Sequence, residues 1–274
     1  MLWRYVALMG SVHVAAVAMA WHVGWVPGAA AWLIGGYCAR MFVVTAGLHR
    51  YFSHRAYKLS RVSQAILAVL VGGVAQQGAL WWAAHHRHHH AFSDQPNDVH
   101  SPVQRGFWFA HIGWLFSPPH RVTHIDRVRD LARYPELRWL DENSSLVSAL
   151  WGVGFYLVGG WSGLTWGFLV PVVVCWHATF TINSLAHVWG SRRYATDDHS
   201  RNNWVLALLT FGEGWHNNHH HYQRSARQGF YPWELDISYL VLRGLAAVRI
   251  VRDLQGVPAH VRDQTAAPQR ERLR

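Results

Sequence analysis

Residues 85–90 read H-H-R-H-H-H and follow an apolar stretch of the chain. Two more histidine-rich clusters occur, H-R-Y-F-S-H at residues 49–54 and H-N-N-H-H-H at residues 216–221. Imidazole is the commonest metal ligand in proteins and suits iron, copper, nickel and zinc. The chain has 21 histidines and only two cysteines among 274 residues. The clusters therefore indicate a metal held by nitrogen ligands rather than by thiolates.

The spacing within the second cluster allows several imidazoles to meet. Residues three and four apart share one face of an α-helix, so His86, His89 and His90 can converge on one point. His85, His88 and His89 have the same spacing. The spacing alone therefore leaves two registers open.

The third cluster repeats the spacing in one register only, because Asn217 occupies the position that a shifted register needs. His216, His219 and His220 therefore face the same side of a helix. Three imidazoles on each of two helices exceed what one four-coordinate ion requires. We infer a site for two metal ions.

The first cluster has a different spacing. His49 and His54 are five residues apart and diverge on a regular α-helix. We expect the preceding helix to continue to about His49, and the backbone to change locally before His54.

Four apolar blocks predict transmembrane helices, since a spanning helix needs ~20 mostly apolar residues. They are Tyr5–Val26, Gly28–Gly47, Ser145–Gly160 and Leu164–Ile182. The turns within each pair carry no charge, so the blocks form two predicted hairpins.

The arginines indicate the orientation. Nearly all of them lie in residues 48–144 and 186–274, and positive charge favours the cytoplasmic side. Both termini and all three clusters are therefore predicted to be cytoplasmic. The formal net charge of +10 also suits nucleic acid, but the arginines flank apolar blocks, so we favour a bilayer surface as the partner and exclude nucleic acid.

A fifth apolar stretch, Val62–Leu80, is ambiguous. As a full span it would separate the second cluster from the first across the membrane. It contains three glutamines and a Gly72-Gly73 pair, and we favour an interfacial course over a re-entrant one.

The sequence thus predicts an all-α integral membrane protein. Four transmembrane helices form two hairpins, and a cytosolic helical cap holds a histidine-rich dimetal site. Residues 1–255 form the predicted membrane domain. The polar tail at residues 256–274 is predicted to be disordered.

Four segments in this order resemble the membrane fatty acyl desaturases of the delta-9, stearoyl-CoA desaturase type. They read A-G-L-H-R-Y-F-S-H-R at residues 46–55, H-R-H-H-H-A-F-S at 86–93, N-S-L-A-H at 183–187 and G-E-G-W-H-N-N-H-H at 212–220. The resemblance covers the chain from about the first span to Glu234.

The resemblance implies the register of the metal ligands. In this family Arg follows the first ligand of the second cluster and Phe-Ser follows the last, which makes His85, His88 and His221 neighbours rather than ligands. His100 and His111 are candidates for contacts behind the ligands. The implied ligands are His49, His54, His86, His89, His90, His187, His216, His219 and His220, with Asn183 acting through a water.

The resemblance also implies the reaction. No side chain can abstract a proton from an unactivated methylene group, so the chemistry needs an oxidant made from O2 at a redox metal. The expected cofactor is a pair of iron ions, with O2 as co-substrate. Two electrons come from an external donor, a ferredoxin or a cytochrome b5-like protein with its reductase. The expected product has a cis double bond, at delta-9 by resemblance.

Four further residues are candidates for the acyl tunnel. By resemblance, Gln77, Trp82 and Thr179 line it, and Tyr37, three turns before His49, closes its end. Ordinary packing is the alternative for each.

The carrier of the acyl chain stays open between CoA and a phospholipid. Animal acyl-CoA enzymes carry Arg-Asp before the second cluster and basic residues after Gly-Trp-Leu. Here those places read Ala84-His85 and Phe116–Pro119. The missing cations weaken the case for CoA, although His120, Arg121 and Arg127 can compensate.

Two other functions compete. A related diiron hydroxylase or a sphingolipid desaturase keeps the metals and changes the product. The segments 183–187 and 212–215 favour the delta-9 branch. A metal transporter places its ligands near the bilayer midplane, whereas these clusters follow the spans.

Overall fold

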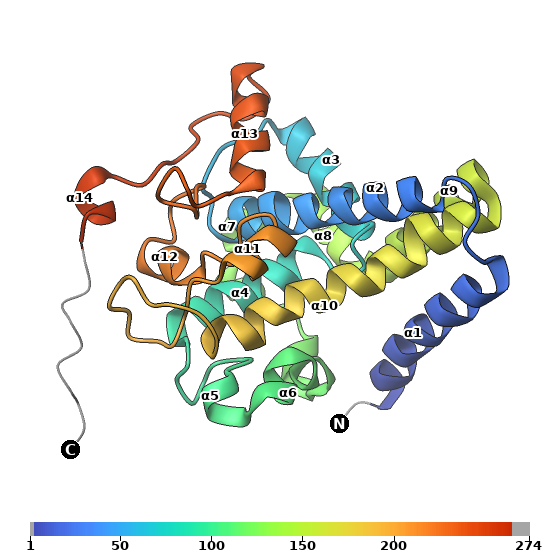
Figure 1. Ribbon diagram of the computed structural model, residues 1–274, viewed down its shortest axis with the longest axis horizontal. Coiled ribbons are helices and arrows are strands. Elements are labelled where there is room, and N and C mark those ends of the chain that lie inside the picture. Colours follow the sequence, from blue (N-terminus) through green and yellow to red (C-terminus); the bar gives the residue numbers. More distant parts are fainter. Residues whose placement is uncertain (1–2, 265–274) are drawn as a thin grey trace.

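The computed structural model describes residues 3–264, and helices form its regular structure (Figure 1). The α-helices carry the label α, and 3-10 or π segments the label η. In chain order they are α1 (Trp3–Val23), α2 (Ala29–Phe42), η1 (Val43–Ser53), α3 (Arg61–Gly72), α4 (Ala79–Phe92), α5 (Pro102–Arg105), α6 (Phe107–His111), η2 (Gly113–Phe116), η3 (Pro118–Arg121), η4 (Ile125–Arg127), α7 (Arg129–Ala132), α8 (Pro135–Glu142), α9 (Ser144–Ser162), η5 (Gly163–Leu169), α10 (Val170–Ser184), η6 (Leu185–His187), α11 (Trp204–Leu209), α12 (His216–His221), α13 (Ile237–Ala247) and α14 (Ala259–Arg262).

Three continuous helical stretches are long and apolar enough to cross a membrane: Trp3–Val23, Ala29–Ser53 and Ser144–His187. The third is broken at Gly160, whose φ of 57° is not helical. A Cβ at Gly163 would lie 2.3 Å from the carbonyl oxygen of Phe155, so the chain folds back closely there. The break coincides with the predicted turn between the last two apolar blocks.

A buried arginine ties the second span to its neighbours. Arg40 donates hydrogen bonds to the carbonyl oxygens of Gly36 (2.9 Å), Gly73 (2.8 Å) and Gly167 (2.9 Å). Its guanidinium carbon also lies 5.0 Å from the ring centroid of Phe155. A charge inside an apolar span is costly unless its donors are bonded, and these carbonyls satisfy most of them.

The ambiguous stretch at residues 62–80 is not one span. α3 ends at the glycine pair and is too short to cross a hydrocarbon core. α4 begins at Ala79, where Asp141 accepts hydrogen bonds from the backbone N–H groups of Leu80 and Trp81 (both 2.9 Å). Asp141 thereby satisfies two donors at the start of the histidine-bearing helix.

The first part of the tail differs from the expectation of disorder. Tyr194 and Tyr231 donate hydrogen bonds to the carbonyl oxygen of Arg262 at 2.7 and 3.1 Å, and α14 forms in this segment. The described part of the tail, residues 256–264, thus includes a short helix and contacts with the rest of the chain. Residues 265–274 lie outside the described part of the chain.

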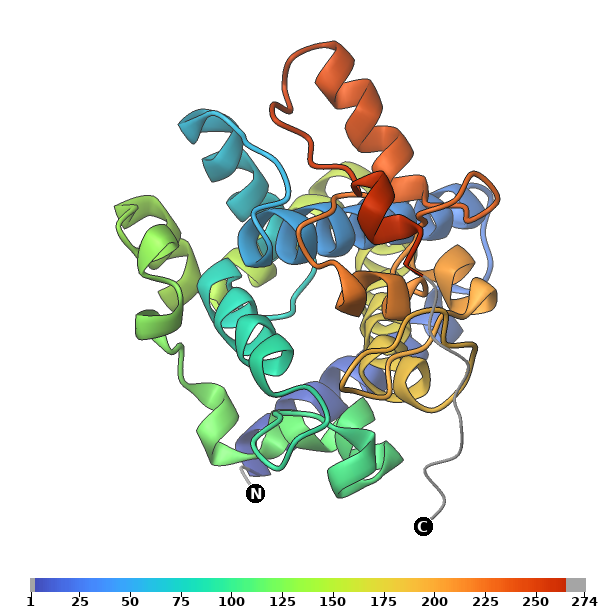
Figure 2. The same cartoon turned by 90° about the vertical axis from the view of Figure 1, so that its left-hand side faces the viewer.

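The N-terminal end of α1 lies beside the segment that holds η2 and η3 (Figure 2). Tyr5 and Arg121 meet there, with 3.4 Å between the guanidinium carbon and the ring centroid. The first span therefore packs against the segment that follows the second histidine cluster.

Candidate metal centre

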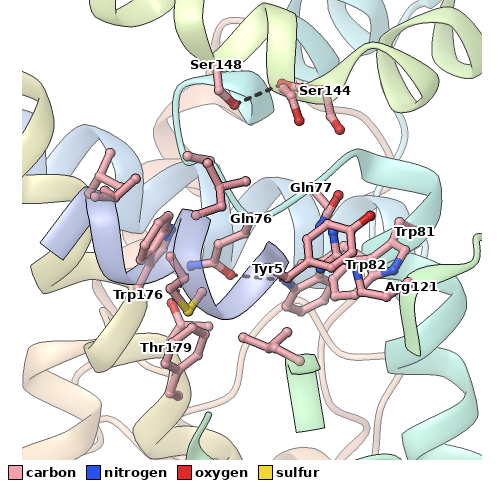
Figure 3. Close-up of a pocket in the computed structure, with 18 of the residues that line it drawn as sticks. Tyr5, Gln76, Gln77, Trp81, Trp82, Arg121, Ser144, Ser148, Trp176 and Thr179 are labelled. Carbon is pink, nitrogen blue, oxygen red and sulfur yellow. Dashed lines mark hydrogen bonds between the residues drawn. The ribbon is translucent and has the colours of Figure 1, made fainter. Parts of the chain in front are cut away.

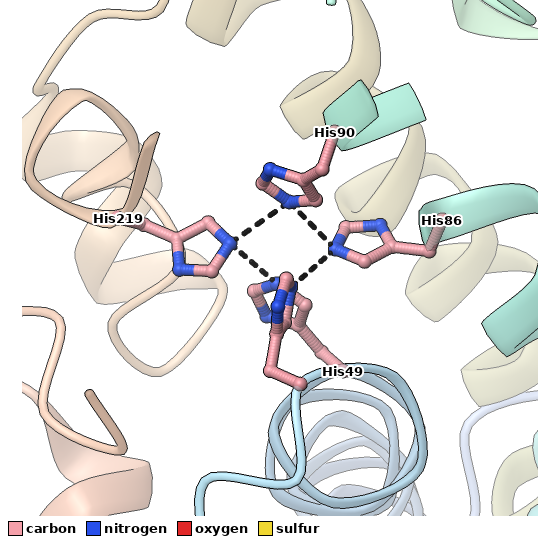
Figure 4. A group of neighbouring side chains, drawn as sticks. His49, His86, His90 and His219 are labelled. Atoms are coloured by element: carbon pink, nitrogen blue, oxygen red, sulfur yellow. Dashed lines mark hydrogen bonds between the residues drawn. The ribbon is translucent and has the colours of Figure 1, made fainter. Parts of the chain in front are cut away.

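Five imidazoles form the first group, drawn in part in Figure 4. They come from η1, the residue after it, α4 and α12: His49, His54, His86, His90 and His219. Successive Nε2 atoms lie 2.8–3.0 Å apart in the order His49, His219, His90, His86, His54. Three segments that are distant in sequence thus direct the same ring atom at one point.

A π-helix brings His49 and His54 together. In η1 the backbone bonds run from residue i to residue i+5, and the N–H of His54 donates to the carbonyl oxygen of His49 (3.1 Å). The two ring centroids are 4.8 Å apart. The predicted change in backbone is confirmed, but it begins at Val43, before His49 rather than after it.

Four imidazoles form the second group: His89, His187, His216 and His220. All four are buried, and the Nε2 atoms of His187 and His216 are 3.0 Å apart. The Nε2 atoms of His89 and His220 are buried without a hydrogen-bond partner. A buried polar atom without a partner is costly, and a bound metal ion would use both of these.

Carboxylates contact four of these imidazoles at Nδ1, the ring nitrogen that is not directed into the metal groups. The pairs are His49 with Glu213, His89 with Asp98, His187 with Asp94 and His220 with Asp198, each through Nδ1. This arrangement fixes the tautomer, directs Nε2 inward and raises its basicity. No sequence pattern pointed to these carboxylates.

The charge states suit metal binding. Burial lowers the pKa of five of these histidines well below the ordinary value: His54, His86, His90, His216 and His219. Burial alone would raise the pKa of Asp94, but the hydrogen bond and charge of His187 lower it below its usual range. The five histidines with a lowered pKa are thus neutral, as metal ligands must be. His89 differs, because Asp98 beside it raises its pKa against the effect of burial.

The spacing of the nitrogens fits metal coordination. At a metal–nitrogen distance of about 2.1 Å, ligands at right angles stand about 3.0 Å apart. The Nε2 atoms of His90 and His219, at 3.0 Å, match this separation. The nine imidazoles could therefore hold two metal ions, one in each group.

The other histidines lie outside these two groups. The Nδ1 atom of His85 bonds the carbonyl of Trp81, and His88 bonds the carbonyl of Asn97. His221 stacks on Tyr194, with ring centroids 4.0 Å apart. Of the two registers in the second cluster, the structure directs His86, His89 and His90 to the metal groups, but not to one point: His86 and His90 belong to the first group and His89 to the second.

His100 and His111, the two histidines predicted to contact the ligands from outside the site, differ in position. His100 is buried against His89, with ring centroids 4.3 Å apart. His111 instead lies at hydrogen-bonding distance from His177 and Ser184, both at 3.0 Å. Only His100 adjoins the metal centre.

A cavity of about 370 Å³ adjoins the first group (Figure 3). Three of the predicted tunnel residues, Gln77, Trp82 and Thr179, line it together with His86 and Asn183. Asn183 therefore faces the same space as a metal-site imidazole. Trp82 stacks on His86, with ring centroids 4.8 Å apart.

Tyr37 lies elsewhere. Its hydroxyl donates to the carbonyl oxygen of Leu209, and its ring packs against Phe211. Within the described residues, Tyr37 is not part of the cavity wall. The prediction that it closes the tunnel is not supported, because tertiary packing turns its ring toward α11.

The chain is similar in sequence to proteins of a known family. A model of the family described as "Fatty acid desaturase" matches residues 23–233. The chain belongs to the fatty acid desaturase family. The family predicted from the four sequence segments is thereby confirmed.

Three relatives show the range of this desaturase family. The sn-2 palmitoyl-lipid 9-desaturase of Nostoc sp. (strain 36) is 32% identical, over 93% of this chain and 91% of the relative. The acyl-CoA C20 Delta5-desaturase of Anemone leveillei is 33% identical, over 94% and 82%. The chloroplastic palmitoyl-monogalactosyldiacylglycerol delta-7 desaturase of Arabidopsis thaliana is 35% identical over 82% of this chain, which spans only 61% of that relative.

The carboxylates behind the histidines provide a test of the metal centre. Asp198→Asn keeps the shape of the side chain but removes the charge that orients His220. We expect the affinity for metal to fall about 10- to 100-fold, measured as the metal retained during titration with a chelator. The neighbouring exposed Asp197→Asn is the matched control, and equal losses in both variants would contradict the orienting role.

Proposed function

We propose that the chain is an O2-dependent fatty acyl desaturase with two iron ions. It inserts a cis double bond, at delta-9, into a saturated acyl chain. One observation carries this proposal: the imidazole of His86, a member of the metal centre, forms part of the wall of a largely apolar cavity. Such an arrangement brings a hydrocarbon chain and a redox metal together.

The residues have separate tasks in this proposal. His49, His54, His86, His90 and His219 hold one iron. His89, His187, His216 and His220 hold the other, with Asn183 reaching it through a water. When bound, the iron pair supplies the oxidation of an unactivated C–H bond by O2.

The cavity positions the substrate. Trp82 stacks flat on His86, so an acyl chain along this wall passes next to a metal ligand. Gln76 donates a hydrogen bond to the hydroxyl of Thr179 (3.1 Å) and accepts one from the indole N–H of Trp82. These hydrogen bonds fix the positions of Trp82 and Thr179, which both line the cavity.

The membrane arrangement is part of the proposal. The break at Gly160 supports a fourth span, so that four helices in two hairpins carry a cytoplasmic cap with the histidine clusters. Electrons would come from a separate ferredoxin or a cytochrome b5-like protein with its reductase. Relatives named for lipid-linked and CoA-linked substrates support either acyl carrier.

The test is expression in a desaturase-deficient host, with gas chromatography and mass spectrometry of the membrane lipids. We expect a new cis-monounsaturated fatty acid, with the double bond located at carbon 9 by fragmentation of its dimethyl disulfide adduct. A hydroxylated product would favour the hydroxylase. Metal uptake without any change in the lipids would favour a transporter, and zinc as the only metal in active protein would contradict the iron assignment.

A further inference from the structure

A second, smaller cavity of about 30 Å³ adjoins both groups of imidazoles. His49 and His86 of the first group line it, and so do His89 and His216 of the second. A water molecule needs about 10–15 Å³ of such a cavity. The space therefore has room for about two water molecules next to both metal groups.

The small cavity is continuous in its lining with the large one. Four side chains belong to the walls of both cavities: Trp82, His86, Thr179 and Asn183. An acyl chain in the large cavity therefore lies next to a space of the size of a solvent molecule.

Four side chains in the wall of the small cavity carry oxygen atoms, and two of them are engaged in several hydrogen bonds. The hydroxyl of Thr179 donates to a carbonyl oxygen of its own helix (2.8 Å) and accepts from Gln76 (3.1 Å). One oxygen of Glu213 accepts from Arg50 (3.1 Å) and the other from Gln228 (3.0 Å). The remaining two are Asn183, which the proposed function assigns to a water-mediated contact with the metal, and Thr210.

Thr210 has an oxygen that is free to accept. The side chain is 1% exposed at the end of α11, and its hydroxyl donates to the carbonyl oxygen of Leu206 (2.6 Å). This bond uses the one hydrogen of the hydroxyl, so the oxygen acts only as an acceptor toward the cavity. Among residues 3–264, Leu206 is its only hydrogen-bond partner. Water is a donor that fits a space of this size.

We infer that Thr210 accepts a hydrogen bond from a water molecule held in the small cavity, and that it positions this water beside the metal groups together with Asn183. The inference rests on the proposed function, in which two iron ions occupy these groups. Thr210 is a positioning residue, since it acts on the metal centre through the water.

The position of this water matters for the use of O2. In the proposed reaction, O2, two electrons, two protons and two hydrogen atoms of the acyl chain give one double bond and two water molecules. When the acyl chain is not oxidised, the same two electrons and two protons reduce O2 to hydrogen peroxide. We expect loss of the ordered water to shift O2 toward peroxide, because protons then arrive without a fixed donor.

The first test needs no acyl substrate. Wild-type protein, Thr210→Val and Thr210→Ser are purified with iron, reduced by one electron to a paramagnetic state and exchanged into heavy water. Pulsed electron paramagnetic resonance then detects deuterons near the metals. Valine keeps the shape of threonine but lacks the oxygen, so we expect Thr210→Val to lose the nearest deuteron signal. Thr210→Ser should retain it.

The second test follows turnover with an external reductant. We expect the share of O2 released as hydrogen peroxide to rise about fivefold in Thr210→Val, as for the loss of one hydrogen bond. Thr181→Val is the matched control. The hydroxyl of Thr181 also donates to a carbonyl oxygen of its own helix, that of Ala178 (2.6 Å), but Thr181 lies outside the two described cavity walls. This variant should behave like wild type in both tests.

The outcomes separate this inference from the proposed function. An unchanged deuteron signal in Thr210→Val, or iron-loaded wild-type protein without such a signal, would overturn the inference. Equal changes in Thr210→Val and Thr210→Ser would also overturn it, because packing rather than the hydroxyl would then be responsible. Wild-type protein that binds iron but forms no double bond would defeat the proposed function, and the spectroscopic comparison would still decide the role of Thr210.

Discussion

Replacing His216 by alanine is expected to abolish double-bond formation, with a loss of more than about 100-fold. His216 is buried at 2% exposure, and its Nε2 lies 3.0 Å from that of His187. Changing a residue that only orients a metal ligand lowers the metal affinity or the activity about 10- to 100-fold. Removing a ligand should lower them more. The product is measured as monounsaturated fatty acid in the expression host, and iron is measured in the purified variant.

His221→Ala is the control for this prediction. His221 lies on the same helix, but it stacks on Tyr194 and lies 3.3 Å from the carbonyl oxygen of Val261. We expect this variant to retain its iron and most of its activity. Equal inactivity of the two variants would contradict the register of the third cluster. A His216→Ala protein with full iron content and full activity would contradict its role as a ligand.

Arg50→Met is expected to reduce the free energy of unfolding by about 3–5 kcal/mol. Arg50 is 1% exposed and lies between two buried carboxylates, 3.1 Å from Glu213 and 2.9 Å from Asp236. Methionine fills the space but leaves both carboxylates buried without their cation. Glu213 also holds His49, so we expect the loss of iron to accompany the loss of stability.

Thermal unfolding in detergent, followed through the release of iron, measures this effect. The control is Arg61→Met, because Arg61 forms an exposed bidentate pair with Glu136 at 2.8 and 3.0 Å. Exposed pairs contribute about 1 kcal/mol or less, so we expect only a small change. If the two variants were equally stable, the buried arrangement around Arg50 would not stabilise the fold as we describe.

The histidines of the metal centre could be predicted because helical periodicity is local. His86, His89 and His90 share a face by spacing alone, and the family pattern then selects the register. Asn183, which only the family resemblance singles out, lines the cavity from α10. The apolar blocks predicted the three continuous candidate spans. They also predicted the break at Gly160, which lies within the third.

The partners of these histidines could not be predicted, because they come from loops. Asp94 and Asp98 follow α4, and Asp198 lies in the long connection after η6. No periodicity connects an aspartate in such a loop to His220, 22 residues later in the chain. Tyr37 was misplaced for a related reason, since helical spacing gives the direction of a side chain but not the neighbour it meets.

The coil of η1 has a consequence for how this chain can vary. Five residues along an α-helix turn a side chain through about 500°, which leaves His54 about 140° away from His49 around the axis. The π-helix between Val43 and Ser53 turns less per residue, so the two side chains point to the same side and their ring centroids lie 4.8 Å apart. The number of residues in this segment therefore matters to the metal centre as much as the histidines themselves. Insertions and deletions that a surface loop would tolerate are excluded here, even where they leave every ligand in the sequence.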